Sequence, residues 1–136
     1  MAEFLEGRPE VERVYYPGLK NHPGREVQRG QARGAGSVLS FTTGDAELSR
    51  RFVESVRLFD IAVSFGSVHS SVSLPCHMSH ASIPPSARER LAPPPDLVRV
   101  SVGIEDAEDL LADLEQAFHA ARRQEAKAQP VAYVGA

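Results

Sequence analysis

Residues 97–111 decide the fold, and they read LVRVSVGIEDAEDLL. Val98, Val100 and Val102 alternate with other side chains over residues 97–102, which is the period of a strand with one buried face. Arg99 therefore projects from the opposite face of that strand. Asp106 is a favoured N-cap and acidic residues follow it, so a helix begins there.

The helix after Asp106 has one apolar side and ends in basic residues. Its apolar stripe consists of Leu110, Leu114, Ala117, Phe118 and Ala121. Arg122 and Arg123 stand in its last turns, where positive charge favours a helix C-terminus. We expect the chain beyond Lys127 to be a frayed tail.

An earlier part of the chain repeats the pattern of strand and helix. Residues 37–42 alternate, with Leu39 and Phe41 on one face. Asp45 is the expected N-cap of a helix, whose apolar side is formed by Leu48, Phe52 and Val56. We expect this helix to lie on a sheet.

Shorter patterns complete the predicted architecture. Strands are predicted at residues 11–16, 59–65 and 70–74, and one or two helical turns at residues 86–91. Residues 2–5 are interpreted as the last part of a longer helix. Strands interleaved with helices indicate an α/β fold, most simply one sheet covered by helices.

Length, charge and cysteine content exclude several classes. The 136 residues suit one domain. A net charge of -3 leaves no basic excess for a nucleic acid, so no nucleic-acid partner is expected. No apolar run approaches the roughly 20 residues of a membrane span, and no targeting segment is visible. The single cysteine, Cys76, excludes an internal disulfide framework and favours a reducing compartment.

Two candidate chemical motifs favour an ordinary structural interpretation, and a third motif is absent from the sequence. The Gly34-Ala35-Gly36 run precedes a predicted strand, whereas a dinucleotide-binding fingerprint follows one. Cys76, His77 and His80 could ligate a metal, but no second cluster completes a zinc site, so no metal is predicted. No serine stands in a nucleophile elbow.

Arg99 has two interpretations from the residues alone. A guanidinium in a valine-rich strand is costly to bury unless an anion meets it. The anion could be a carboxylate of the chain, for which Glu105 or Asp106 would serve, or it could be a ligand. Spacing alone favours the structural ion pair.

Several separated runs of the sequence agree in order and spacing with one family. They are YYPGL at 15–19, GAGS at 34–37, IAVSFG at 61–66, MSH at 78–80 and LVRVSVGIE at 97–105. They resemble the C-terminal domain of the cystathionine-metabolising (Cys/Met metabolism) family of pyridoxal phosphate (PLP) enzymes over nearly the whole chain. VSFGSV at 63–68, with LPC at 74–76 and MSHASIP at 78–84, resembles the plant-type cystathionine β-lyases more than the γ-synthases or γ-lyases.

The resemblance implies a fold and a site. Residues 1–127 would form the small C-terminal α/β domain of a fold-type I PLP enzyme, with one mostly antiparallel sheet covered by helices, and 128–136 a frayed tail. Arg99 would hold the substrate α-carboxylate, with Ser64 beside it and Phe65 in the same substrate-binding motif. The catalytic and cofactor-binding residues would belong to a preceding large domain that is absent here, so none is assigned in this chain.

The resemblance also implies an activity. The complete enzyme would be a PLP-dependent carbon–sulfur lyase of methionine biosynthesis that converts cystathionine to homocysteine, pyruvate and ammonia. It would be a homotetramer in the cytoplasm or the plastid stroma, with a small amino acid as substrate and no membrane partner. Lys20 and Lys127 are the two lysines present, and neither stands in the family's lysine motif, so the chain alone is expected to be inactive.

Two alternatives remain open. The chain could be a noncatalytic module that binds an amino-acid carboxylate or a full-length relative. It could also be a fragment of a cystathionine γ-synthase or γ-lyase. His69 replaces an acidic residue that relatives usually carry after the serine motif, which weakens the assignment to γ-chemistry.

Overall fold

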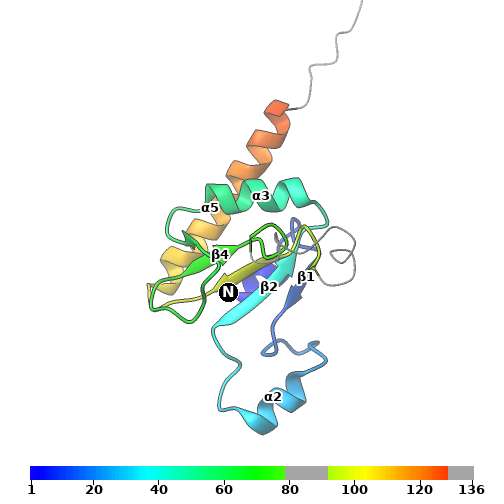
Figure 1. The fold of residues 1–136 in the computed structure, drawn as a ribbon, viewed down its shortest axis with the longest axis vertical. Coiled ribbons are helices and arrows are strands. Elements are labelled where there is room, and N and C mark those ends of the chain that lie inside the picture. The colour runs from blue at the N-terminus through cyan, green and yellow to red at the C-terminus, as the bar shows by residue number, and fades with distance from the viewer. Residues whose placement is uncertain (79–91, 129–136) are drawn as a thin grey trace, which may run out of the picture.

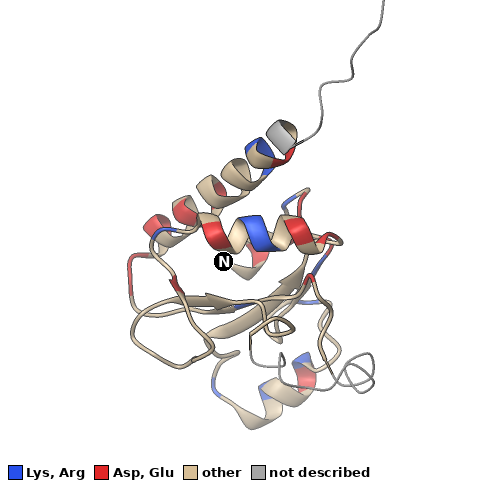
Figure 2. Ribbon diagram, turned by 45° about the horizontal axis from the view of Figure 1, so that its top comes forward, with Lys and Arg blue, Asp and Glu red and all other residues tan. Residues whose placement is uncertain are grey.

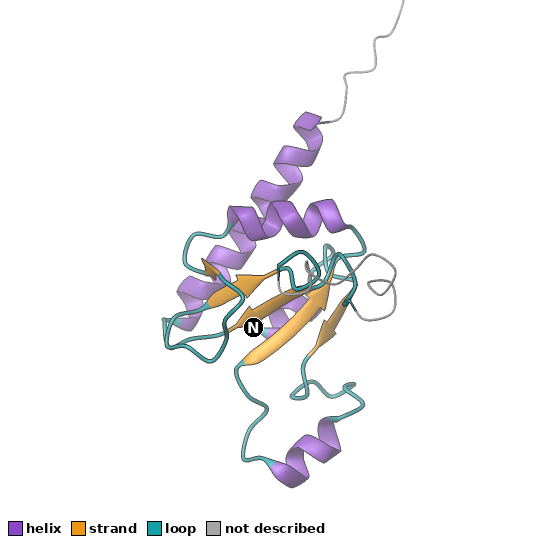
Figure 3. Cartoon of the chain, in the orientation of Figure 1, coloured by secondary structure: helices purple, strands orange, loops and turns teal. Residues whose placement is uncertain are grey.

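The structure, a computed structural model, describes residues 1–78 and 92–128. Its elements in chain order are α1 (Ala2–Glu6), β1 (Arg13–Tyr15), α2 (Arg25–Gln31), β2 (Val38–Thr42), α3 (Ala46–Ser55), β3 (Asp60–Ile61), β4 (Ser71–Ser73), β5 (Val98–Ser101) and α5 (Ala107–Ala128). Helices α3 and α5 pack together beside the sheet, and α2 stands apart at the other end of the molecule (Figures 1 and 3). The helical turns predicted at residues 86–91 and the tail beyond residue 128 lie outside the described residues.

The five strands form one sheet in the order β1-β2-β5-β4-β3. All neighbouring strands are antiparallel except β3 and β4. The last strand in the sequence, β5, is therefore the central one. In its register Arg99 lies opposite Ser40 of β2 and Ser73 of β4. The predicted α/β fold, with one mostly antiparallel sheet covered by helices, is confirmed.

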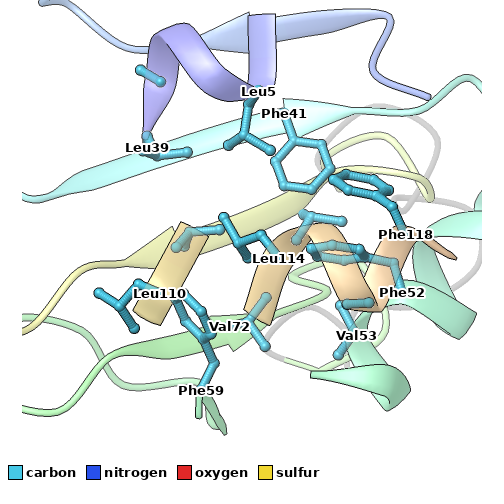
Figure 4. Packing of buried hydrophobic residues seen from close by; sticks show 14 of the residues in the cluster. Leu5, Leu39, Phe41, Phe52, Val53, Phe59, Val72, Leu110, Leu114 and Phe118 are labelled. Carbon is cyan, nitrogen blue, oxygen red and sulfur yellow. The ribbon is translucent and has the colours of Figure 1, made fainter. Parts of the chain in front are cut away.

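The core lies between the sheet and the pair of helices α3 and α5 (Figure 4). Val98 and Val100 of β5 are fully buried, as their alternation predicts. Phe41, Phe52 and Phe118 come from a strand and two helices and meet in the same cluster, with ring centroids 4.3 Å apart for Phe52 and Phe118 and 5.5 Å apart for Phe41 and Phe52. Such ring contacts stabilise the core beyond the burial of their area.

Both long helices begin at the aspartates that the sequence predicts. Asp45 and Asp106 each accept hydrogen bonds from the backbone N–H groups two and three residues later, at 2.8 and 3.3 Å. These side chains satisfy donors that have no partner inside the helix. The caps therefore fix where α3 and α5 start.

Two elements differ from the sequence prediction. The strand predicted over residues 59–65 ends at Ile61, because β3 pairs only with the short β4 and the chain then leaves the sheet. Gly66 has a φ of 80°, which favours glycine and turns the chain back toward β4. No sequence pattern predicts α2, since none of its residues is buried and it has no apolar stripe.

A polar cluster joins the segment after α1 to α5. The buried Glu10 carboxylate accepts two hydrogen bonds of 3.2 Å from Arg8 and lies 3.0 Å from Nε of Arg122. The Arg8 guanidinium lies 5.6 Å from the ring centroid of Phe4 and 5.5 Å from that of Phe118. Burial raises the pKa of Glu10, but hydrogen bonds from its own backbone and Arg8, with the charges of Arg8 and Arg122, bring that pKa below its usual value.

The outer side of the helical layer is charged with both signs. Figure 2 shows acidic and basic positions interspersed along α3, where Arg50 pairs with Glu47 at 2.9 Å and with Glu54 at 2.7 Å. Exposed pairs of this kind add little to stability. Within residues 1–78 and 92–128, no helix is both long and apolar enough to cross a membrane.

Candidate functional site

Arg99 leaves the central strand on the face of the sheet that does not form the core. Its neighbours Val98 and Val100 are 0 % exposed on the core face, and successive side chains of a strand point to opposite faces. Nη2 of Arg99 donates to the carbonyl oxygen of Val63 at 2.5 Å, and Cζ lies 4.9 Å from the ring centroid of Phe65. The ring and the carbonyl are thus the two contacts that orient the guanidinium of the partly exposed Arg99.

Ser64 and Phe65 lie on the loop of residues 62–70, which joins β3 to β4 and is called loop 62–70 below. Ser64 stands between Val63, whose carbonyl meets Arg99, and Phe65, whose ring covers it. The carbonyl oxygen of Ser64 accepts from Oγ of Ser71 at 3.2 Å. The structure thus brings Arg99 and Phe65 into direct contact and places Ser64 next to both contacts along the chain.

The interpretation of Arg99 as part of a structural ion pair with Glu105 or Asp106 is wrong. Among the described residues, no carboxylate oxygen lies within 4.0 Å of the Arg99 guanidinium. Glu105 accepts hydrogen bonds from Ser70, and Asp106 caps α5. Both acids follow β5 closely in sequence, but the chain turns after Gly103, so their side chains contact Ser70 and the first turn of α5 and not Arg99.

The sequence pattern does not reveal the groups that hold loop 62–70. Oγ of the buried Ser101, on β5, accepts from the backbone N–H of Gly66 at 3.0 Å. Glu105 accepts from the backbone N–H of Ser70 at 2.6 Å and from its Oγ at 2.8 Å. The one available signal is the Gly103 that separates a strand from a helix, because glycine at such a point often marks a close approach of backbone.

The hydrogen bonds to Glu105 change its acidity. The pKa of the Glu105 carboxyl lies below its ordinary value of 4.5, and the largest cause is the hydrogen bond from the backbone N–H of Ser70. The Glu105 backbone, the Ser70 hydroxyl and the nearby His69 lower the pKa further, whereas burial raises it by less than these effects together lower it. Because folding lowers this pKa, the ionised Glu105 stabilises the folded state, and this contribution is complete above pH 4.5. The contribution is lost as the pH falls through the folded-state pKa.

We therefore expect an acid transition in the amide signal of Ser70. In a nuclear magnetic resonance titration from neutral to acid pH, the proton shift of that amide should move with a midpoint below 4.5, because protonation weakens its acceptor. The same titration of Glu105→Gln should show no such transition. A midpoint above 4.5 in the unaltered chain would contradict the assignment.

The other candidate motifs do not form sites in the described part of the chain. The carbonyl oxygens of Gly34 and Gly36 accept from Gln28 and Tyr16, so this run is an ordered loop entrance to β2. Cys76 is buried, His77 is exposed and His80 lies outside the described residues. Residues 1–78 and 92–128 contain no group of three or more His, Cys, Asp or Glu side chains that could hold a metal ion.

The chemistry around Arg99 fits a carboxylate and does not by itself make a PLP site. PLP is held in its enzymes through a lysine and groups that bind its phosphate and ring. Lys20, whose side chain the structure describes, is exposed in the connection between β1 and α2. Arg99 instead offers a planar cation beside the aromatic ring of Phe65, which suits the carboxylate of a bound amino acid.

Comparison with known proteins gives consistent relatives. The model of the family "Cys/Met metabolism PLP-dependent enzyme" matches residues 1–119. The chloroplastic cystathionine beta-lyase of Mimosa pudica is 58% identical over 118 residues, which cover 87% of this chain and 26% of that protein. The cystathionine gamma-lyase of Bacillus subtilis is 49% identical over 118 residues, which cover 87% of this chain and 31% of that protein. The chain thus spans about a quarter to a third of the length of these relatives.

A solved structure agrees with the sequence comparison. The crystal structure of metB from Corynebacterium glutamicum is similar with a TM-score of 0.79 and 49% identity, covering 87% of this chain and 30% of that one. Both the fold and most of the sequence therefore match the same group of proteins. The resemblance expected from the separated motifs is confirmed, and the chain belongs to the Cys/Met metabolism family of PLP-dependent enzymes.

Proposed function

We propose that this chain supplies the substrate-carboxylate site of a PLP-dependent carbon–sulfur lyase that resembles cystathionine β-lyase. The observation that carries the proposal is the half-buried Arg99, whose one hydrogen-bond acceptor among the described residues is the neutral carbonyl of Val63. Its charge therefore has no counter-ion within this part of the protein, and an anionic ligand would supply one. The 58% identity to a β-lyase favours an amino acid as that ligand.

In this role the segment binds and orients the substrate. PLP, when bound to the complete enzyme, supplies the electron sink that lets a proton leave Cα and a thiolate leave Cβ. Arg99 would hold the α-carboxylate through two parallel hydrogen bonds. These bonds would strengthen substrate binding and would also fix the direction of the bonds at Cα. Ser64 would donate one further hydrogen bond, and Phe65 would keep the guanidinium in its plane. From cystathionine the products would be homocysteine, pyruvate and ammonia.

The PLP-binding and proton-transferring groups are assigned to the part of the relatives that this chain does not match. Apolar side chains on and beside loop 62–70 support this assignment, since they are 51 to 82 % exposed where soluble proteins usually keep such area covered: Ile61, Val63, Phe65, Val68 and Ile104. The chain alone would then be inactive. By resemblance to the family, the complete enzyme would be a homotetramer, in the cytoplasm or the plastid stroma.

Cleavage at Cγ is the second candidate, because the Bacillus subtilis γ-lyase is 49% identical over the same length. The two reactions share the carboxylate clamp and differ in which carbon–sulfur bond breaks. Cleavage at Cβ of cystathionine releases homocysteine and a three-carbon oxoacid, and cleavage at Cγ releases cysteine and a four-carbon oxoacid. Product analysis therefore separates them.

The test is a chimera in which this chain replaces the matching 118 residues of the Mimosa pudica β-lyase, called the β-lyase chimera below. We expect the PLP-loaded chimera to form pyruvate and homocysteine from cystathionine, and the chain alone to form neither. A folded, PLP-loaded chimera that binds no amino acid would contradict the proposal and favour a noncatalytic module that binds a full-length relative. Formation of cysteine and 2-oxobutyrate would assign the γ-reaction instead.

A further inference from the structure

Loop 62–70, which carries Ser64 and Phe65, has few contacts of its own. Residues 63–69 are all exposed, so the loop buries little apolar area that could fix its path. Its position over Arg99 therefore depends on the hydrogen bond from the backbone N–H of Gly66 to Oγ of Ser101 in its middle and on the groups that hold its two ends. One end leaves the sheet at β3, and the other returns to it at Ser70 and β4.

The returning end rests on the segment that follows β5. The backbone N–H of Ile104 donates to the carbonyl oxygen of Val68 at 3.0 Å. Gly103 lies directly against the loop backbone, because a Cβ on Gly103 would overlap the carbonyl oxygen of Val68 and lie 2.8 Å from the carbonyl carbon of His69. A residue without a side chain is therefore needed where strand and loop meet.

Glu105 then ties the last residue of the loop in place. Its Oε1 accepts from the backbone N–H of Ser70 at 2.6 Å, and its Oε2 accepts from Oγ of Ser70 at 2.8 Å. Oγ of Ser70 also accepts from the backbone N–H of Gly103 at 2.9 Å. Because Ser70 is 0 % exposed and both carboxylate oxygens are used, this contact permits one arrangement of the loop end.

We propose that Gly103 and Glu105 are positioning residues that hold loop 62–70 over Arg99, so that the carboxylate site is formed before the substrate binds. The proposal rests on the proposed function of Arg99. Both residues would act indirectly, Gly103 through the loop backbone and Glu105 through Ser70. Residues 99–105 thus present the cation and also fix the loop that completes its site.

The test compares two Glu→Gln variants of the β-lyase chimera. Glu105→Gln keeps the shape of the side chain but replaces one of the two acceptors with a donor, and we expect the KM for cystathionine to rise about tenfold with kcat changed less than about threefold. Glu108→Gln is the matched control, since Glu108 is an exposed residue of the first turn of α5, and its KM should stay at the wild-type value. Gly103→Ala should raise KM in the same direction by displacing the loop.

Hydrogen exchange supplies a readout that does not depend on turnover. In Glu105→Gln the amides of residues 64–70 should exchange faster while those of α5 stay protected. If Glu105→Gln lowers Tm but matches Glu108→Gln in KM and in loop exchange, the role is merely structural and the proposal fails. If the unaltered chimera cleaves no cystathionine, the proposed function fails, and loop exchange still decides whether Glu105 holds the loop.

Discussion

Replacing Arg99 with lysine in the β-lyase chimera is expected to lower kcat/KM for cystathionine about 100-fold, or about 3 kcal/mol of transition-state stabilisation. Lysine keeps the positive charge but loses the planar fork that can bind both carboxylate oxygens. It also loses the flat surface that stacks on Phe65 at 4.9 Å. The measurement is steady-state pyruvate formation, with the folded fraction of each variant determined by thermal unfolding.

Two comparisons make this result decisive. Ser64→Ala should lower the same parameter by less, because it removes one neutral donor and no charge. The Tm of Arg99→Lys should stay close to that of the parent, since Arg99 has no acidic partner within the described part of the chain. Normal kinetics in a folded Arg99→Lys chimera would remove the main support for a carboxylate site here.

Truncation of Phe118 to alanine is expected to cost about 3 to 5 kcal/mol of unfolding free energy, the usual range for a buried phenylalanine. The ring is 0 % exposed, and its centroid lies 4.3 Å from that of Phe52 and 6.0 Å from that of Phe41. The substitution would leave a cavity between sheet and helices and would also remove the surface against which Arg8 stacks.

Urea unfolding of the chain measures this loss as a lower midpoint with an unchanged m-value. His119→Ala is the matched control, because His119 is the next residue of α5 and is exposed. It should change the unfolding free energy by less than about 0.5 kcal/mol. Equal effects of the two substitutions would mean that the aromatic cluster is not the centre of the core.

Strong periodicity explains which elements could be predicted. Only a strand buries both Val98 and Val100 on one face, and the structure has the strand β5 there. Only a helix buries Leu110, Leu114 and Phe118 together on one side, and the structure has the helix α5 there. Helix α2 lacks any buried residue, so no periodic signal marks it. A strand is predicted near β3, but its end at Ile61 is not, because its length depends on pairing with β4 and not on its own residues.

The candidate site, like the fold, could be predicted from the sequence only in part. Alternation alone predicts that Arg99 projects away from the core, and the roles proposed for Arg99, Ser64 and Phe65 come from the family resemblance. The contacts of Glu105 with Ser70 join residues 35 positions apart, which no local pattern specifies. Nearness in sequence suggested the wrong partner for Arg99, because the turn after Gly103 reverses the direction in which the following acids point.

The place of β5 in the middle of the sheet has a consequence for biosynthesis. As the chain emerges from the ribosome, β1 with β2, and later β3 with β4, can pair locally, but the two pairs have no contact in the sheet until residues 98–101 are available. The pairing of Val38 with Ser101 joins residues 63 positions apart, so closure of the sheet is slow compared with local pairing. Until then β2 and β4 each present an open edge on which another nascent chain can pair. A ribosome that stalls before residue 98 would therefore leave a product that is prone to aggregate, and the same late strand that carries Arg99 is the one that ends this exposure.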